Sequence, residues 1–177
     1  MRPVPLLRLA AAALLSCALS GAAGTAWAAE PVAGDVPPDV VGMNIDRVPV
    51  KLSQYAGKAV VISFWATWCP YCLKELPVLS AIQKAGKGNV HVIAINTEDR
   101  DVFRRTSRVL RELEIELAYD PDKQAQKAYG VSGIPHMVII GRDGRIVNVY
   151  RGYDESSLDG IVTAINRATG ATPAPDF

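Results

Sequence analysis

Residues 59–65 read Ala-Val-Val-Ile-Ser-Phe-Trp, and residues 66–72 continue as Ala-Thr-Trp-Cys-Pro-Tyr-Cys. The first seven residues are nearly all apolar, which is typical of a strand that is buried on both faces of a sheet. Pro70 suits the first turn of a helix, because its missing N–H would have no partner there in any case. The stretch therefore predicts a buried strand that runs into a helix, with a Cys-x-x-Cys pair at the junction.

The position of the two cysteines predicts which of them reacts first. Cys69 stands at the expected helix start, where unpaired backbone N–H groups and the helix dipole favour a thiolate. We therefore expect Cys69 to have a lowered pKa and to act as the nucleophile. Cys72 lies one turn further along on the same face and deeper in the helix, so we expect it to be the resolving thiol, which attacks the mixed disulfide.

The remaining chain alternates apolar strands with helices that have one apolar face. Asp143 and Gly144 separate the last two strands and signal a tight hairpin. This order predicts an α/β fold in which helices flank a mixed sheet. We expect edge strands within 41–52, strands at 59–65, 89–96, 115–119, 137–141 and 146–150, and helices at 70–86, 102–113, 123–129 and 158–168.

The composition fits one domain with its own core. The chain has 177 residues, of which 49% are hydrophobic, and a formal net charge of +1. Arg2 and Arg8 are the only charges before Glu30, which leaves 17 of the 19 basic residues against 18 acidic ones. A balance so near neutrality gives no electrostatic reason to expect a nucleic-acid partner.

The first 28 residues read as a removable secretion signal. Arg2 and Arg8 supply a basic start, residues 9–19 an apolar stretch, and Ala26-Trp27-Ala28 a small-x-small cleavage site. The apolar run is short for a permanent membrane span, which is the alternative. We therefore expect an exported, periplasmic protein with a signal at 1–28, a flexible leader at 29–40, one domain at 41–169 and a tail at 170–177.

Cys17 has two interpretations. Leu14-Leu15-Ser16-Cys17 is similar to a lipoprotein signal, in which the cysteine is lipidated and becomes the new N-terminus. Cys17 is otherwise a small apolar residue that is lost with the signal, and the well-placed Ala-Trp-Ala site favours this interpretation. A single Cys-x-x-Cys pair then remains, which is too few cysteines for a disulfide-held scaffold and indicates chemistry or metal binding.

Residues 64–72, Phe-Trp-Ala-Thr-Trp-Cys-Pro-Tyr-Cys, resemble the active-site segment of the thioredoxin superfamily. Glu75, Pro77, the Tyr-Gly-Val-Ser-Gly-Ile-Pro run at 129–135 and the Gly-Arg-Asp-Gly-Arg-Ile run at 141–146 are similar to exported oxidoreductases of the TlpA, ResA and CcmG type. The likeness covers about residues 40–168. It implies a thioredoxin fold with N-terminal edge strands and an extra helix and strand between the cysteines and the Ile-Pro pair.

The resemblance also implies how a substrate is held. In this family the bond between Ile134 and Pro135 is cis and faces the disulfide, beside a backbone site where a substrate chain can pair as an extra strand. Trp68, Pro70 and Tyr71 flank the cysteines, so they are expected to contact the substrate as well.

Glu75 is the third catalytic candidate. It follows Cys72 by three residues and so lies on nearly the same helix face, and the resemblance implies that it handles the Cys72 proton. Ser63 stands where thioredoxin has a buried Asp, and a serine cannot ionise in this range, which leaves Glu75 as the nearest proton acceptor. Burial would raise the pKa of Glu75 into a useful range; the alternative is a solvated helix carboxylate.

The resemblance implies a reductase of disulfides in exported proteins, with cytochrome c maturation as one use. Such an enzyme needs no cofactor and no metal, but it requires a membrane partner that supplies electrons, and we expect a monomer. An oxidase that forms disulfides in its substrates is the alternative within the same chemistry.

Three alternatives come from other classes. Thiolates and imidazole suit copper, so Cys69, Cys72 and His136 together would indicate a copper-handling protein. Pro70-Tyr71 is the dipeptide of glutaredoxins, although the flanking residues differ. The third alternative is a redox-inert interaction protein, and it depends on a basic helix face that is otherwise a solvated surface: Arg104, Arg105, Arg108 and Arg111.

Overall fold

The computed structural model describes residues 30–170, so the predicted signal at 1–28, Cys17 and the tail beyond Gly170 lie outside the described residues. Seven strands form one sheet in the order β2-β1-β5-β4-β3-β6-β7. The strands are β1 (Val40–Met43), β2 (Pro49–Lys51), β3 (Ala59–Trp65), β4 (Val90–Asn96), β5 (Glu116–Tyr119), β6 (His136–Ile140) and β7 (Ile146–Arg151). The helices are α1 (Pro70–Ala85), α2 (Arg100–Val109), α3 (Gln124–Ala128) and α4 (Leu158–Thr169), with short 3-10 turns η1 (Leu52–Tyr55), η2 (Leu110–Leu113) and η3 (Glu155–Ser157).

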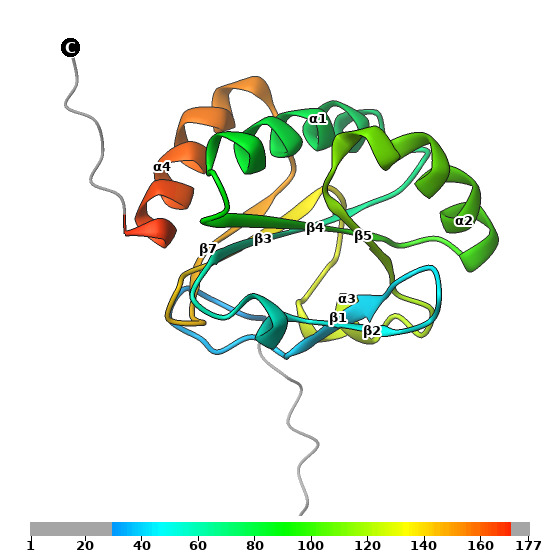
Figure 1. Cartoon of the computed structure of the whole chain (residues 1–177), viewed down its shortest axis with the longest axis horizontal. Coiled ribbons are helices and arrows are strands. Elements are labelled where there is room, and N and C mark those ends of the chain that lie inside the picture. Colours follow the sequence, from blue (N-terminus) through cyan, green and yellow to red (C-terminus); the bar gives the residue numbers. More distant parts are fainter. Residues whose placement is uncertain (1–29, 171–177) are drawn as a thin grey trace, which may run out of the picture.

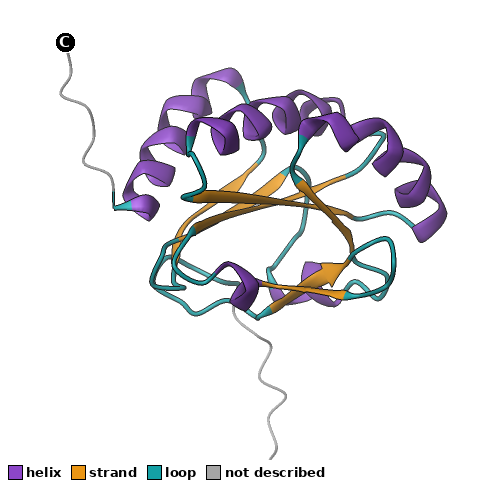
Figure 2. Ribbon diagram, viewed as in Figure 1, coloured by secondary structure: helices purple, strands orange, loops and turns teal. Residues whose placement is uncertain are grey.

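The sheet is mixed, as the sequence predicted. β3 runs parallel to β4 and antiparallel to β6, while β4 is parallel to β5 and β7 closes a hairpin with β6. Helices α1, α2 and α4 cover one face, and α3 lies with the β1–β2 hairpin and η1 on the other side (Figures 1 and 2). None of the described helices is long and apolar enough to cross a membrane.

β3 divides the core into two layers, because successive side chains of a strand point to opposite faces. Val61 and Trp65 face α1 and α4 and share a cluster with both cysteines. Ile62 and Phe64 face the other way, toward α3 and the β1–β2 hairpin. All seven residues of β3 are buried, and burial of each large apolar side chain stabilises the fold by about 2 kcal/mol.

The expected helix at 102–113 is interrupted. The Asp99 side chain accepts a hydrogen bond from the N–H of Val102 at 2.9 Å, so α2 begins at Arg100. The helix ends at Val109 and continues as the 3-10 turn η2, after which Glu114 takes a left-handed conformation with φ 56°. Residues 110–113 therefore depart from the regular helix that the apolar pattern predicted.

The segment before β1, expected as a flexible leader, lies against the rest of the domain. The N–H of Gly34 donates to the Ile146 carbonyl at 2.8 Å, and the N–H of Ile146 donates to Asp35 at 2.9 Å. The Tyr129 hydroxyl donates to the Pro38 carbonyl at 2.9 Å. These contacts hold the segment beside β7 and α3.

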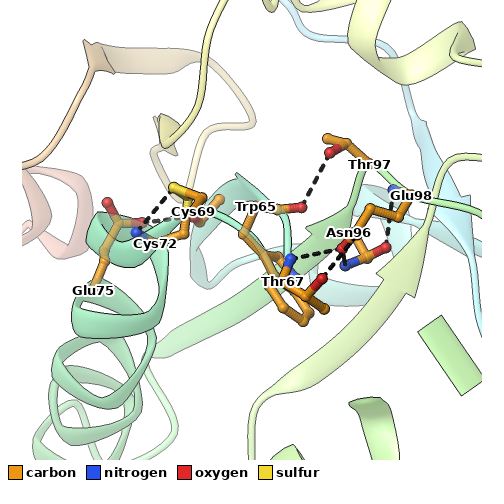
Figure 3. Close-up of a disulfide and its surroundings, with 9 residues drawn as sticks. Trp65, Thr67, Cys69, Cys72, Glu75, Asn96, Thr97 and Glu98 are labelled. Carbon is orange, nitrogen blue, oxygen red and sulfur yellow. Dashed lines mark hydrogen bonds between the residues drawn. A yellow bond between two sulfur atoms is a disulfide. The ribbon is translucent and has the colours of Figure 1, made fainter. Parts of the chain in front are cut away.

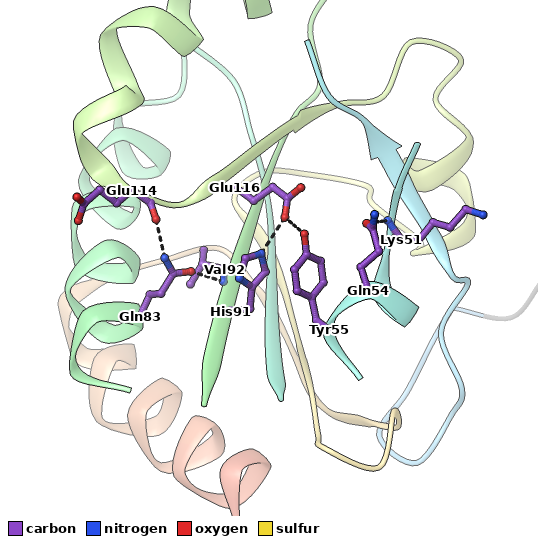
Figure 4. Close-up of polar contacts among 8 residues, drawn as sticks. All are labelled: Lys51, Gln54, Tyr55, Gln83, His91, Val92, Glu114 and Glu116. Carbon is purple, nitrogen blue, oxygen red and sulfur yellow. Dashed lines mark hydrogen bonds and ion pairs between the residues drawn. The ribbon is translucent and has the colours of Figure 1, made fainter. Parts of the chain in front are cut away.

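Polar contacts join η1 to β4 and β5 (Figure 4), at the end of the sheet that is opposite the cysteines. The hydroxyl of Tyr55 donates to Glu116, and His91 Nε2 lies 2.8 Å from the same carboxylate. The rings of Tyr55 and His91 are stacked with centroids 3.7 Å apart. Burial alone would raise the pKa of Glu116, but the hydrogen bonds from His91 and Tyr55 hold it below its usual value.

Candidate active site

Cys69 and Cys72 form a disulfide at the junction of β3 and α1 (Figure 3), with an S–S distance of 2.06 Å. Cys69 is the N-cap of α1: its backbone is extended, and its Sγ accepts a hydrogen bond from the N–H of Cys72 at 3.2 Å. Pro70 occupies the first helical turn. The Cys72 N–H, which has no partner within the helix, therefore points at the Cys69 sulfur. This arrangement favours a thiolate at Cys69 when the pair is reduced.

Exposed apolar side chains flank the disulfide along the chain. Cys72 is fully buried and Cys69 is 4% exposed, and the exposed neighbours that we call the rim are Trp68, Pro70, Tyr71 and Leu73. Exposed fractions are 68% for Trp68, 57% for Tyr71 and 44% for Leu73. Of the two cysteines, Cys69 is the one with any exposed surface, so it is the one that an incoming thiol or disulfide can approach.

The peptide bond between Ile134 and Pro135 is cis, as the resemblance implied. Ile134 packs against the cluster that contains both cysteines, and Pro135 is buried. The carbonyl of Pro135 accepts a hydrogen bond from Gly152 at 2.8 Å. Within residues 30–170, the N–H and C=O of Ile134 have no hydrogen-bond partner, so a substrate backbone can use them.

Glu75 is buried, with 1% of its surface exposed, one turn beyond Cys72 on α1. Its Oε1 accepts a hydrogen bond from the Ser63 hydroxyl at 2.5 Å, while Oε2 has no partner among the described residues. Burial raises the pKa of Glu75 to about 7, although the Ser63 hydrogen bond opposes the rise. A carboxyl group with this pKa exchanges protons at neutral pH.

Tyr153 is a residue that the sequence did not single out. It packs, half-buried, against the cluster that contains the cysteines, directly after Gly152, whose N–H holds Pro135. Burial comes first among the causes that raise the pKa of Tyr153, and the negative charge of Glu75 adds to it. Its one sequence signal is its position behind a glycine that follows the last strand.

His136 faces away from the cysteines. It begins β6, where Met137 points to the cysteine cluster and His136 to the opposite layer, edge-on to Phe64 with centroids 5.9 Å apart. The fold thus keeps His136 from joining Cys69 and Cys72 in the trio that the copper alternative requires. Residues 30–170 hold no group of three or more His, Cys, Asp or Glu side chains arranged to bind a metal.

The environment of His136 disfavours its charged form. The side chain is fully buried, and neither ring nitrogen has a hydrogen-bond partner in the described part of the chain. Burial, with a smaller effect from Arg151, lowers the pKa of His136 to about 4, and Glu30 opposes the shift. The imidazole is therefore neutral at physiological pH.

A second feature that the sequence did not reveal is a carboxylate beside the active-site loop. Glu98 follows β4 and accepts hydrogen bonds from the N–H and the hydroxyl of Thr67, two residues before Cys69 (Figure 3). The available signal was the polar run at 96–99, which follows a buried strand parallel to β3. Carboxyl ends of parallel strands meet at one edge of a sheet, which is where functional loops gather.

Comparisons with known proteins agree with this site. The Redoxin family model matches residues 32–165. Thiol-disulfide oxidoreductase ResA of Bacillus thuringiensis subsp. konkukian is 28% identical over 120 residues, covering 67% of this chain and 69% of that protein. ResA of Geobacillus thermodenitrificans is 30% identical over 123 residues, with the same shares covered.

A solved structure is similar across the whole domain. A Chlorobium tepidum protein assigned as thiol:disulfide interchange protein DsbE superposes with a TM-score of 0.68 at 26% identity, covering 80% of this chain and 100% of that one. The α/β thioredoxin fold expected from the sequence is confirmed by this likeness together with the seven-stranded mixed sheet.

Proposed function

This chain belongs to the Redoxin family, and on that basis we propose that Cys69 and Cys72 are the redox-active dithiol of a reductase for exported proteins. The general activity follows from its relatives: the chain is a thiol:disulfide oxidoreductase of the TlpA, ResA and CcmG type. Its partners are proteins with disulfides or thiols. The observation that carries the proposal is the disulfide at the start of α1, where Cys69 caps the helix.

The reaction proceeds in two exchange steps. The Cys69 thiolate attacks one sulfur of a substrate disulfide, forming a mixed disulfide and releasing the other substrate sulfur as a thiolate. The Cys72 thiolate then attacks Cys69 Sγ, which forms the Cys69–Cys72 disulfide and releases the second substrate sulfur. Two electrons pass to the substrate, and its two sulfurs take up two protons.

Glu75 is the proposed acceptor of the Cys72 proton. Cys72 is fully buried, so its thiol cannot readily lose a proton to bulk water. Glu75 lies one turn further along α1 and is likewise buried, with one carboxylate oxygen free of partners among the described residues. A base with a pKa of about 7 is matched to proton transfer near neutral pH.

Substrate contact is assigned to two groups of residues. Trp68, Pro70 and Tyr71 of the rim present exposed apolar surface beside the sulfurs, which suits an unfolded or loosely folded protein segment. Ile134 offers an unpaired N–H and C=O next to the cis Pro135, which suits pairing with an extended substrate strand.

The cellular setting is also part of the proposal. Residues 1–28 direct export, residues 29–40 lead into the domain at 41–169, and a tail follows. Export places the enzyme in the periplasm, with lipidation at Cys17 as the alternative to removal of the signal. Disulfides are normally formed there, so a monomeric reductase draws electrons from a membrane partner; apocytochrome c is a proposed substrate class.

Two single-cysteine variants test the assignment of roles. With a reduced enzyme and a protein disulfide such as that of insulin, Cys69→Ser abolishes reduction. Cys72→Ser still attacks but cannot resolve, so a mixed disulfide through Cys69 accumulates and can be identified by mass spectrometry under non-reducing conditions. Accumulation through Cys72 in the Cys69→Ser variant, or equal trapping by both variants, would reverse or remove the assigned roles.

A further inference from the structure

The loop between β3 and α1 is held by one carboxylate from the segment that follows β4, the strand next to β3. Glu98 Oε2 accepts a hydrogen bond from the Thr67 N–H at 2.6 Å, and Oε1 accepts one from the Thr67 hydroxyl at 2.8 Å. Figure 3 shows the two side chains facing each other to the right of the disulfide. Both donors of Thr67 are thus bound by one ionisable group, and hydrogen bonds to a charged acceptor are about twice as strong as neutral ones.

Glu98 is itself held in place. The Asn96 side chain accepts a hydrogen bond from the Glu98 N–H at 2.9 Å and donates to Oε2 at 3.3 Å. Asn96 ends β4 and is paired in register with Trp65, the last residue of β3. The N–H of Thr97 donates to the Trp65 carbonyl at 3.0 Å. The carboxylate is therefore attached to the rigid end of the sheet.

The bound loop carries the reacting residues. Residues 66–68 are the whole connection between β3 and Cys69, and the Cys69 N–H donates to the Ala66 carbonyl at 3.2 Å. A shift of Thr67 would move Cys69 out of its N-cap geometry and would move the exposed Trp68 of the rim. With so short a connection, fixing Thr67 fixes where the nucleophile stands.

We propose that Glu98 is a positioning residue for disulfide exchange, which holds Thr67 so that Cys69 stays at the helix start and Trp68 stays beside the sulfurs. The inference rests on the proposed role of Cys69 as the nucleophile. Glu98 touches no reacting atom, so it acts through Thr67. Misplacement of a reacting group by about 1 Å can cost as much as 100-fold in rate.

The direction in which the midpoint of the alkylation pH profile moves separates a positioning role of Glu98 from a simple effect of its charge. The rate at which iodoacetamide alkylates reduced Cys69 rises with pH as the thiolate forms. Removing a nearby negative charge stabilises the thiolate and moves the midpoint of this profile to lower pH. Loss of the N-cap geometry removes the stabilising helix start and moves the midpoint to higher pH.

The experiment uses reduced wild-type chain, Glu98→Ala and Glu98→Gln, with Glu112→Ala as a matched control for an exposed carboxylate on η2. Iodoacetamide profiles and kcat/KM for insulin reduction are measured on each. Glu98→Ala is expected to raise the midpoint by about one pH unit and to lower kcat/KM at least tenfold. Glu98→Gln, which keeps an acceptor for the Thr67 N–H, gives a smaller change in the same direction, and Glu112→Ala matches the wild type.

Thr67 provides the second pair of variants. Thr67→Val removes only the hydroxyl and is expected to give part of the Glu98→Ala effect. Thr67→Ser keeps the hydroxyl donor, so its midpoint and kcat/KM are expected to match those of the wild type. A midpoint that stays unchanged or moves down in Glu98→Ala overturns the inference. Failure of the wild type to reduce insulin would instead count against the proposed function, because the alkylation profile tests the positioning without any protein substrate.

Discussion

Ser63 on β3 and Glu75 on α1 are joined by a buried hydrogen bond of 2.5 Å, which crosses from the central strand to the helix that begins with the cysteines. The contact satisfies one oxygen of a carboxyl group in the core and leaves the other without a partner among the described residues. Burial would push the pKa of Glu75 upward, and the Ser63 hydroxyl limits that rise, so the group titrates near pH 7. Two predictions depend on this pair.

Glu75→Gln is expected to slow exchange above neutral pH and to leave the fold intact. Gln cannot accept the Cys72 proton, so the rise in rate around pH 7 disappears and the rate at pH 8 falls by roughly 100-fold. The measurement is stopped-flow tryptophan fluorescence during oxidation of the reduced enzyme by a protein disulfide, from pH 5 to 9. A variant with the wild-type pH–rate profile would exclude Glu75 as the proton acceptor.

Ser63→Ala should move the same inflection without removing it. Loss of the hydroxyl leaves the carboxylate form with one hydrogen bond fewer, so the pKa of Glu75 rises further and the inflection shifts to higher pH. Glu75→Gln combined with Ser63→Ala should be no slower than Glu75→Gln alone. If Ser63→Ala moved the inflection to lower pH, the hydrogen bond would not be acting on the charged form.

Because buried His136 has a lowered pKa, we expect the protein to lose stability in acid. The unfolded chain takes up a proton at His136 near pH 6.5, whereas the folded chain does so only near pH 4. The unfolded state therefore binds more protons in this window, and the free energy of unfolding falls as the pH falls from 6.5 to 4, by on the order of 3 kcal/mol. Above pH 6.5 the stabilising contribution of the neutral imidazole is fully present.

The check is urea unfolding of the oxidised wild type and of His136→Gln at several pH values. Other titrating groups are common to both proteins and cancel in the difference. The wild type should lose more stability in acid than the variant. Parallel losses in the two proteins would mean that the burial of His136 carries no titration cost.

The rim should matter for protein substrates and not for small thiols. Trp68→Ala removes an exposed aromatic side chain beside Cys69, and such interface anchors commonly contribute 1–2 kcal/mol, which corresponds to about a tenfold lower kcat/KM for insulin. Dithiothreitol has no chain to contact the rim, so its rate should stay unchanged. Val109→Ala, at a 77% exposed apolar side chain on α2, is the control. An equal loss with both substrates would assign Trp68 to the chemistry instead of binding.

Some of the molecule could be predicted because its determinants are local. The bounds of β3 coincide with the apolar run at 59–65, and α1 begins at Pro70 as the missing N–H indicated. The approximate place of Glu75 followed from helical spacing, since three residues after Cys72 is nearly the same face. Its burial and its contact with Ser63 depend on how closely α1 packs on the sheet, which a spacing argument does not fix.

Other features depend on pairings between distant residues. Glu98 meets Thr67 across 31 residues of chain, and the contact exists because β3 and β4 lie parallel with Trp65 opposite Asn96. The face that His136 takes depends on strand register, since a slip of one residue would turn it toward the cysteines. A polar run after a strand indicates that something lies at the sheet edge, but it does not identify the partner.

The reduction potential of the Cys69–Cys72 pair tests the proposed direction of electron flow most directly. It is measured by equilibrating the wild-type protein with glutathione or dithiothreitol buffers and quantifying free thiols. A potential more negative than about −220 mV is the result expected of a reductase that a membrane donor keeps reduced. A potential near about −120 mV would contradict the account, because the protein would then donate its disulfide to substrates as an oxidase.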